Sequence, residues 1–410
     1  MTSTEDPSWP PGSASFAVPT GSALANDLLH FLASLGQRSE AELYLRLFRE
    51  TQSQTFALLV PTNGVLREHA GTLAEQLGYL QKLGLRPALV LGAIEPVDND
   101  LVEHLRLNLK EVGVSGQRRE LSSAGRAAAA SASDTSPALP LYLAPRPSDA
   151  QLRQLVGMLH PRKLLFLRRA GGLGPHGSGN VVLPDGHFLP SNENGIGVIN
   201  LRSDGQELRR LLPQAESRWL DRCSALFADE QGWGARETIS ITSPLSLLRE
   251  LFTVRGAGTL VKRGAAIASA SDYAQLSAQT VRHLLEAAFG RRVKDDFFER
   301  SPESLYFEKS LRGLAVLEAG RGAAFLSKFA VLPEARGEGL GQDLWWALCK
   351  RNSAIYFRAR PDNPIVSWYA SVCDGMQRTE KWNIYWKGIE ARLIPQLIQD
   401  AVSRPEDFEG

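Results

Sequence analysis

The first two thirds of the chain alternate between helical and extended patterns of hydrophobic residues. Leucines spaced three and four apart predict a helix over residues 24–50, and the apolar run at 55–60 predicts a buried strand. Residues 71–85 have an amphipathic helical pattern and lead into a second apolar run at 86–92. A strand, a helix and a strand at this spacing predict a parallel βαβ unit, and further strand-like runs follow at 140–144, 163–169 and 238–243. We therefore predict an open α/β sheet in this part of the chain.

The hydrophobic pattern changes near residue 270. One helical segment at 281–290 is followed by three strand-like runs in quick succession, at 304–310, 313–319 and 323–332. Such a meander is typical of an α+β domain and differs from the repeated βαβ pattern before it. Because 410 residues exceed what one hydrophobic core usually supports, two domains are expected. We predict a disordered leader at 1–22, a first domain at 23–268 and a second domain at 269–410.

Composition and charge narrow the possible partners. The chain has 46 Lys and Arg residues against 45 Asp and Glu, so it has no overall field that would hold a nucleic acid or an anionic membrane. Its three cysteines fit neither a disulfide framework nor zinc-ligand spacing. No apolar run is long enough to span a bilayer, and the acidic leader, rich in Ser, Pro and Gly, lacks the features of a targeting segment. We expect a soluble cytoplasmic protein.

Two further segments carry no recognisable chemistry. Residues 120–140 are biased to Ala and Ser and lack an apolar period, so they predict a flexible loop within the first domain. The glycine-rich excursion from Arg168 contains the sequence LPDGHF, which resembles a hairpin turn. Its His176 and His187 have no third ligand at a defined spacing, so we predict solvated loop histidines and no metal site.

The sequence LPEARGEGLGQDLWWALCK, residues 332–350, predicts a binding loop. It follows a strand and opens a helix, where free backbone N–H groups and closely approaching glycines favour a phosphate or pyrophosphate. The guanidinium of Arg336 would add donors. A Walker loop would require Lys and then Ser or Thr after the last glycine, and a Rossmann fingerprint would require a distant acidic residue; neither fits. A glycine-rich helix start without a ligand remains the alternative.

The pattern Arg336-x-x-Gly339-x-Gly341 resembles the Q/R-x-x-G-x-G/A motif of the GCN5-related N-acetyltransferases. With FLSKFAVLPEARGEGLGQDLWW, YFRARPDNPIVSWYASVCDG and EKWNIYWKGIE, residues 270–400 resemble the acetyltransferase domain of vertebrate-type N-acetylglutamate synthases and bacterial bifunctional synthase/kinases. The resemblance implies an α+β fold of the GCN5-related type and acetyl-CoA as co-substrate. It places acetyl-CoA on the strand end and loop formed by Phe329, Ala330, Val331, Arg336, Gly337, Gly339, Leu340 and Gly341.

A trio of cations is predicted to gather beside this loop. Lys328 lies on the preceding strand, and Arg358 and Arg360 are two residues apart on the next strand, which puts them on one face. An acceptor with two carboxylates, such as glutamate, would need at least two such cations. The alternative is that these charges only protect exposed strand edges. The family resemblance implies that Lys328, Arg358, Arg360 and Asn363 bind the glutamate.

Tyr369 is the candidate general acid. By position it matches the family's tyrosine near the thioester sulfur, and its reference pKa of about 10 exceeds the roughly 8.5 of a thiol, so it could protonate the departing thiolate. Simple packing of Tyr369 beside Trp368 in the core is the alternative. Direct attack by the amine needs no covalent intermediate, so Cys349 and Cys373 need not be nucleophiles.

Residues 24–265 resemble the amino-acid kinase fold of acetylglutamate kinases, an open αβα sandwich. Val60 stands where that family has a lysine, and Thr62, Asn63 and Ile94 replace or interrupt its glycine-rich phosphate loops. A neutral side chain cannot neutralise a transferring phosphoryl group, so we expect kinase activity to be absent.

One segment of the first domain matches the family intact. In RELFTVRGAGT, Glu250, Gly256 and Gly258 resemble the segment that binds arginine in arginine-sensitive members, and a purely scaffolding or oligomerisation role is the rival. The resulting hypothesis is an N-acetylglutamate synthase in the first step of arginine biosynthesis, forming homo-oligomers (dimer or tetramer). The alternatives are acetylation of another acidic amine, a residual acetylglutamate kinase, or a non-catalytic arginine or acetyl-CoA sensor.

Overall fold

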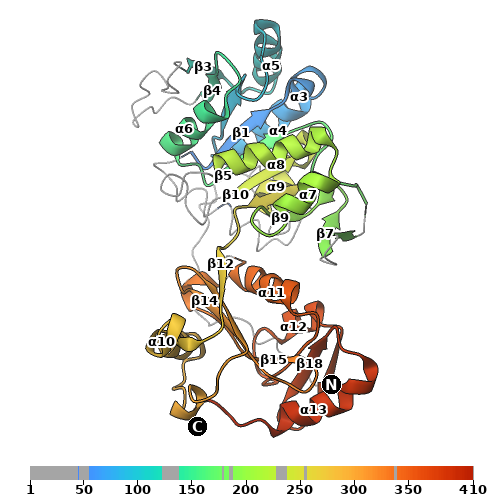
Figure 1. Cartoon of the computed structure of the whole chain (residues 1–410). Coiled ribbons are helices and arrows are strands. Elements are labelled where there is room, and N and C mark those ends of the chain that lie inside the picture. Colours follow the sequence, from blue (N-terminus) through green and yellow to red (C-terminus); the bar gives the residue numbers. More distant parts are fainter. Residues whose placement is uncertain are drawn as a thin grey trace, which may run out of the picture.

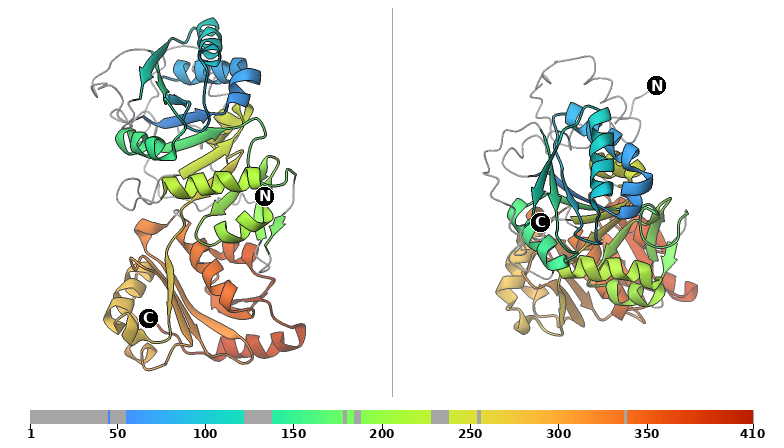
Figure 2. Two further views of the ribbon diagram at one scale, coloured as in Figure 1. Left: turned by 45° about the horizontal axis from the view of Figure 1, so that its top comes forward. Right: turned by 90° about the horizontal axis from the view of Figure 1, so that it is seen from above.

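The computed structural model describes Leu45 and residues 55–121, 138–177, 180–183, 188–227, 238–253, 256–336 and 339–409. These include two large sheets that lie one beyond the other along the molecule, as Figure 1 and the left view of Figure 2 show. The predicted leader and almost all of the first predicted helix lie outside the described residues, as do 122–137 of the predicted flexible loop.

The first sheet has eight strands in the order β3-β4-β2-β1-β5-β10-β11-β9. All its pairs are parallel except β10 with β11, which confirms the predicted parallel βαβ unit. Its strands are β1 (Ala57–Pro61), β2 (Ala88–Leu91), β3 (Gly116–Glu120), β4 (Leu139–Leu143), β5 (Lys163–Leu167), β9 (Val198–Asn200), β10 (Thr238–Thr242) and β11 (Thr259–Lys262).

Helices cover both faces of this sheet, because its central strands are apolar on both sides. Leu59 and Leu89 face one core, which includes residues of α3 (Asn63–Glu68), α4 (Ala70–Lys82), α5 (Asn99–Glu111) and α9 (Leu247–Phe252). Leu58 and Val90 face the other, with α6 (Asp149–Leu159), α7 (Gly205–Leu211) and α8 (Gln214–Leu226). The predicted αβα sandwich is therefore confirmed.

A small antiparallel sheet of β6 (Asn180–Val182), β7 (Phe188–Asn192) and β8 (Gly195–Ile196) accompanies the first domain. β6 and β7 pair on either side of the predicted LPDGHF turn, whose central residues 184–187, His187 among them, lie outside the described part. His176 is exposed, as predicted for a loop histidine.

The second sheet has seven strands in the order β12-β13-β14-β15-β16-β18-β17. It begins at β12, so the predicted domain boundary at 268/269 falls within this strand. The predicted meander corresponds to β13, β14 and β15, which pair antiparallel. The strands are β12 (Ile267–Ala270), β13 (Ser304–Glu308), β14 (Gly313–Glu318), β15 (Ala324–Val331), β16 (Ile355–Ala359), β17 (Gly375–Arg378) and β18 (Asn383–Lys387).

Helices also cover both faces of the second sheet. On one face, α11 (Leu340–Arg351) and α12 (Val366–Val372) pack over Leu317, Leu326 and Phe357. On the opposite face, α10 (Ala278–Phe289) covers Leu305 and Val316, while α13 (Ile394–Ser403) covers Phe325 and Tyr356.

Strands β15 and β16 diverge, and this divergence positions the site. They are the sole parallel pair of the second sheet in the described chain, joined at Ala324–Ile355 and Phe325–Tyr356 alone. β15 continues beside β14 to Val331, whereas β16 continues beside β18 to Ala359. A bulge at Ser327 bends β15 where the strands part. The result is a wedge-shaped opening in the sheet, whose inner backbone edge on β15 is not paired with β16.

Candidate active site

A cavity of about 160 Å³ lies where β15 and β16 part. It brings together side chains from the two diverging strands, from α12 and from the C-terminal tail, which we define as Arg404–Glu409. The five residues that the sequence predicted for the acceptor and the proton transfer all line it: Lys328, Arg358, Arg360, Asn363 and Tyr369. Phe329, on the predicted acetyl-CoA strand end, lines it as well.

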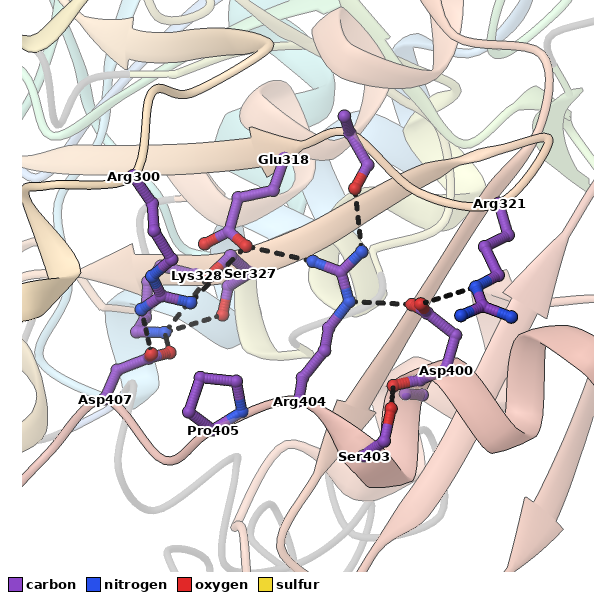
Figure 3. Close-up of polar contacts among 12 residues, drawn as sticks. Arg300, Glu318, Arg321, Ser327, Lys328, Asp400, Ser403, Arg404, Pro405 and Asp407 are labelled. Atoms are coloured by element: carbon purple, nitrogen blue, oxygen red, sulfur yellow. Dashed lines mark hydrogen bonds and ion pairs between the residues drawn. The ribbon is translucent and has the colours of Figure 1, made fainter.

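Lys328 is buried, with 6% of its side chain exposed, and its partner is in the tail. Its ammonium forms an ion pair with Asp407 and also contacts the backbone oxygen and hydroxyl of Ser327 at 3.1 and 3.2 Å (Figure 3). These three acceptors match the three donors of an ammonium group. Arg300 pairs with the same carboxylate. Burial opposes ionisation of Asp407, but Lys328 and Arg300 together lower the pKa of its carboxyl.

The two arginines lie on the α13 face and stack on Trp382. The guanidinium carbons of Arg358 and Arg360 lie 4.4 and 4.6 Å from the centre of its indole ring. Arg358 donates from Nη1 to the backbone oxygens of Ala401 and Arg404 at 2.8 and 2.7 Å, and from Nη2 to that of Pro405. This arginine therefore holds the end of α13 through Ala401 and the start of the tail through Arg404 and Pro405.

Arg360 is less constrained than Arg358. It is 41% exposed and makes an ion pair of 2.7 Å with Glu406, which also pairs with Lys381. Asn363 lies just beyond, at the turn that leads into α12, where its side-chain oxygen accepts from the amide of Ile365 at 3.1 Å. Arg360 thus makes fewer hydrogen bonds to the described residues than Arg358 does.

Tyr369 lies on α12, on the other side of the diverging strands. Only 4% of it is exposed, and its ring packs against Phe357 and Tyr385 at centroid distances of 4.8 and 5.5 Å. Burial raises the pKa of its hydroxyl well above the ordinary value, which keeps the group protonated at neutral pH. Burial likewise raises the pKa of both Cys349 and Cys373 to about 12, so neither is a ready thiolate nucleophile.

The predicted binding loop leads into α11 as expected. Gly339 is the N-cap and has a φ of +86°, a left-handed conformation that favours glycine. The first amides of α11, including those of Leu340 and Gly341, have no partner within the helix and can serve an anion. Gly337 lies outside the described residues.

Two cations lie near this loop. Arg336 donates to the backbone oxygens of Ala288, at 2.7 Å, and Val331, at 3.4 Å, and its role at a pyrophosphate stays a prediction. A different cation approaches from the first domain, because a Cβ atom added to Gly339 would lie 3.1 Å from the ammonium nitrogen of Lys262. Lys262 is the last residue of β11.

The same region of the first domain is attached to α11. Asp343, in the first turn of α11, accepts from the side-chain amide of Asn200 at 2.6 Å and from the backbone amide of Ala265 at 2.8 Å. Asn200 ends β9, directly beside Lys262 in the sheet register. Burial raises the pKa of the Asp343 carboxyl, although its two hydrogen bonds oppose the shift. The strand ends of the first domain thus hold the helix that opens at the loop.

In the first domain, the predicted phosphate loops have other contacts. Val60 is fully buried in β1, and Thr62 caps the short helix α3. The backbone amide of Asn63, which starts α3, donates to the carboxylate of Glu95. An acidic group therefore occupies the first amide of α3, where the resemblance to the kinases predicted a phosphate loop.

The residues of the predicted arginine segment hydrogen-bond to one another. Glu250 is 3% exposed, and its carboxylate accepts from the backbone amides of Ala257 and Gly258 at 2.7 and 3.0 Å. Gly256 has a φ of +63°, and a Cβ atom there would lie 2.7 Å from the same carboxylate. The three predicted residues do come together, with Glu250 organising the loop that the glycines form.

Sequence reasoning missed four residues of this region. Glu406 and Asp407 pair with the predicted acceptor cations, Trp382 stacks on two of them, and Lys262 approaches the loop from another domain. The acidic pair in SRPEDFEG and the tryptophan in EKWNIYW were visible, but nothing in their spacing indicated which cations they would meet. Among the described residues, no group of His, Cys, Asp and Glu could hold a metal, and no helix is both long and apolar enough to cross a membrane.

Comparison with known proteins gives a consistent result. Residues 268–404 match the family model for the N-acetyltransferase domain of N-acetylglutamate synthase. The chain is 27% identical to the mitochondrial N-acetylglutamate synthase of Mus musculus over 98% of its own length and 85% of that protein. It is 25% identical to a protein of Xylella fastidiosa named acetylglutamate kinase, over 90% of this chain and 99% of that one.

A solved structure agrees on the fold. The N-acetylglutamate synthase of Neisseria gonorrhoeae, complexed with coenzyme A and N-acetylglutamate, aligns with a TM-score of 0.50 at 16% identity and covers 85% of this chain and 97% of its own. The alignment spans both sheets, so the order of the two domains is shared. The chain is an amino-acid N-acetyltransferase, in which residues 268–404 match the family model for the acetyltransferase domain of N-acetylglutamate synthase and follow a domain of the amino-acid-kinase fold.

Proposed function

We propose that this protein transfers the acetyl group of acetyl-CoA to the α-amine of L-glutamate. The observation that carries the proposal is the cavity at the parting of β15 and β16, which three cations, Asn363 and the buried Tyr369 all line in an acetyltransferase domain. A dicarboxylic acceptor requires paired cations, and a thioester requires an open strand edge and a proton donor. This cavity offers both.

The strand end and the loop fit acetyl-CoA. The backbone edge of Phe329–Val331, unpaired by β16, would orient the pantetheine arm and the thioester carbonyl. The first amides of α11 and the ammonium of Lys262 would hold the pyrophosphate, since Gly339 lets the chain approach closely. Arg336 would act on the loop through its contact with Ala288, which holds the loop against the end of α10.

The acceptor carboxylates would bind chiefly to Arg360 and Asn363. Lys328 already uses its donors on Asp407 and Ser327, so it would contribute by its position and charge. Arg358 would support the same site while holding the tail. The α-ammonium first loses one proton to water, and the free amine attacks the thioester carbonyl directly. The C–S bond breaks as Tyr369 donates its proton to the departing thiolate, and the proton that the newly acylated nitrogen sheds returns Tyr369 to its neutral form.

Kinase activity is the second candidate, because a relative bears that name. The buried Val60 and the carboxylate of Glu95 on the first amide of α3 argue against it, since both oppose the binding and neutralisation of phosphoryl oxygens. For the first domain we propose a supporting role at the Asp343 contact. Arginine binding at Glu250 would require the loop 256–258 to release this carboxylate. We also retain a cytoplasmic location and a homo-oligomer as proposals.

The test is thiol release from acetyl-CoA with each amino acid offered singly and without ATP, followed by ADP formation from ATP with N-acetylglutamate. We expect turnover with glutamate and no ADP. Turnover with aspartate alone would show that the acceptor is aspartate and not glutamate. ADP formation that depends on N-acetylglutamate would refute the absence of kinase activity. Isothermal titration with L-arginine tests the regulatory role, and the absence of heat at millimolar concentration would end it.

A further inference from the structure

The C-terminal tail lies across the proposed acceptor site and is fixed there by its backbone. The amide of Lys294 donates to the oxygen of Asp407, and the amide of Glu409 donates to the oxygen of Arg292, both at 2.9 Å. Phe408 forms a bridge with Val293 in the same pairing. Arg404 anchors the start of the tail through Glu318 and Asp400 at 3.0 and 2.7 Å, as Figure 3 shows. The backbone of the tail is therefore a wall of the cavity.

The two adjacent acids of the tail differ in how firmly they are held. Asp407 is 9% exposed and lies between the buried Lys328 and Arg300. Glu406 is 30% exposed, and its partners Arg360 and Lys381 are 41% and 54% exposed. A partly exposed ion pair is weaker than a buried one, so the Glu406 side chain can turn away while the backbone stays in place.

Glu406 forms an ion pair with Arg360, the cation that the acceptor carboxylate would need. Arg360 lines the cavity, and its Nη2 donates to the Glu406 carboxylate at 2.7 Å. The hydrogen bond from Lys381 also lowers the pKa of Glu406, so this carboxylate is charged at neutral pH. A carboxylate of glutamate would present the same chemical group to the same donors.

We propose that Glu406 is an internal competitor of the acceptor carboxylate and thereby sets the affinity and specificity of the acceptor site; this rests on the proposed function. On binding, the acceptor displaces the Glu406 side chain from Arg360 and leaves it with Lys381. An acceptor without a second carboxylate cannot make this exchange, because nothing would replace the broken ion pair. Glu406 therefore selects for acceptors with two carboxylates. It also lowers the affinity of the site for every such acceptor.

The opposite role for Glu406 predicts the opposite sign. If Glu406 served to orient Arg360 for the acceptor, removal of the Glu406 carboxylate would leave the guanidinium without a fixed orientation and would weaken acceptor binding. Competition predicts that removal strengthens it. Since an exposed ion pair contributes little, the expected change under competition is a few-fold decrease in the KM for glutamate.

The experiment compares Glu406→Gln and Glu406→Ala with the wild-type full chain by steady-state thiol release at saturating acetyl-CoA. Glu409→Gln is the matched control, because it removes one charge from the same tail at a side chain that is 53% exposed and 3.8 Å from Arg292. We expect the KM for glutamate to fall roughly two- to fivefold in both Glu406 variants, with unchanged kcat and an unchanged KM for acetyl-CoA, and not to fall in the control.

The possible outcomes separate the two proposals. Wild-type turnover of glutamate together with an unchanged or raised KM in the Glu406 variants overturns the competitor role and leaves the proposed function standing. An equal fall in Glu409→Gln also overturns it, because general charge attraction would then explain the effect. No glutamate turnover by any form refutes the proposed function, and the competitor role with it. Titration of N-acetylglutamate into the same proteins gives a readout without turnover, and tighter binding is expected only in the Glu406 variants.

Discussion

Asp407→Asn should destabilise the second domain, because it leaves the ammonium of Lys328 buried without its counter-charge. Lys328 is 6% exposed, and within the described chain its ion-pair partner is Asp407, which also accepts from Arg300. Breaking a buried ion pair by changing one partner costs roughly 3–5 kcal/mol. Asparagine keeps one acceptor oxygen, so we expect about 3 kcal/mol, which corresponds to a fall of roughly 6–12 °C in the melting temperature for a domain of ordinary size.

The assay is urea denaturation followed by tryptophan fluorescence, with Glu409→Gln as the control. The exposed pair of Glu409 with Arg292 should contribute less than about 0.5 kcal/mol. A loss below about 1 kcal/mol in Asp407→Asn would refute the reasoning. Lys328 would then have found water or another acceptor, or it would have lost its proton, because burial lowers the pKa of its ammonium and Asp407 opposes that shift. Adding Lys328→Met should recover much of the loss, because the double variant leaves no uncompensated ammonium.

The same pair predicts a pH dependence with a definite sign. The folded protein lowers the pKa of Asp407 below its value in the unfolded chain, so the pair stabilises the fold at pH values above about 4. This contribution is lost as the pH falls through the lowered pKa of the folded state. The stability of Asp407→Asn should therefore change less than that of the wild type over this acidic range. Equal slopes for the two proteins would contradict the assignment.

Two further predictions concern turnover. Tyr369→Phe should lower kcat by roughly 10²-fold with little change in the KM for either substrate, because the thiolate would leave without its proton. Unchanged kcat in steady-state thiol release would remove Tyr369 as the acid. Lys262→Ala should raise the KM for acetyl-CoA about tenfold but leave activity unchanged with S-acetylpantetheine, a donor that lacks all phosphates. An equal loss with both donors would show that Lys262 acts on the domain contact instead.

The fold was predictable where hydrophobic period and turn chemistry agree. The antiparallel run from β13 to β15 and the glycine-opened helix α11 follow from local patterns, and the structure has them where they were expected. The face shared by Arg358 and Arg360 also follows, from the two-residue period of a strand. Each of these features depends on residues that are close in sequence or on an adjacent strand.

The partners of the charged side chains were not predictable. Lys328 meets Asp407 across 79 residues of sequence, from a tail that has no hydrophobic period of its own. Arg336 lies in the predicted loop, yet it turns to a carbonyl at the end of α10 because that oxygen is within reach and unpaired in its helix. Long side chains have several such choices, and local sequence does not distinguish among them. The sequence thus indicated which residues would line one cavity, but it did not indicate which ion pairs and hydrogen bonds their side chains would make.

The contact between Asn200 and Asp343 gives the first domain a testable part in acetyl transfer. Asn200→Asp replaces the amide donor at 2.6 Å by a second carboxylate beside one whose pKa burial already raises, so one of the two must stay protonated or the contact must open. Either result loosens the first turn of α11, and we expect a several-fold rise in the KM for acetyl-CoA with little change in the KM for glutamate. Asn192→Asp is the matched control, because its amide donates to Gly258 within the first domain at 2.9 Å and makes no contact with α11. An equal effect of the two variants would mean that stability of the first domain, rather than its hold on α11, limits binding of acetyl-CoA.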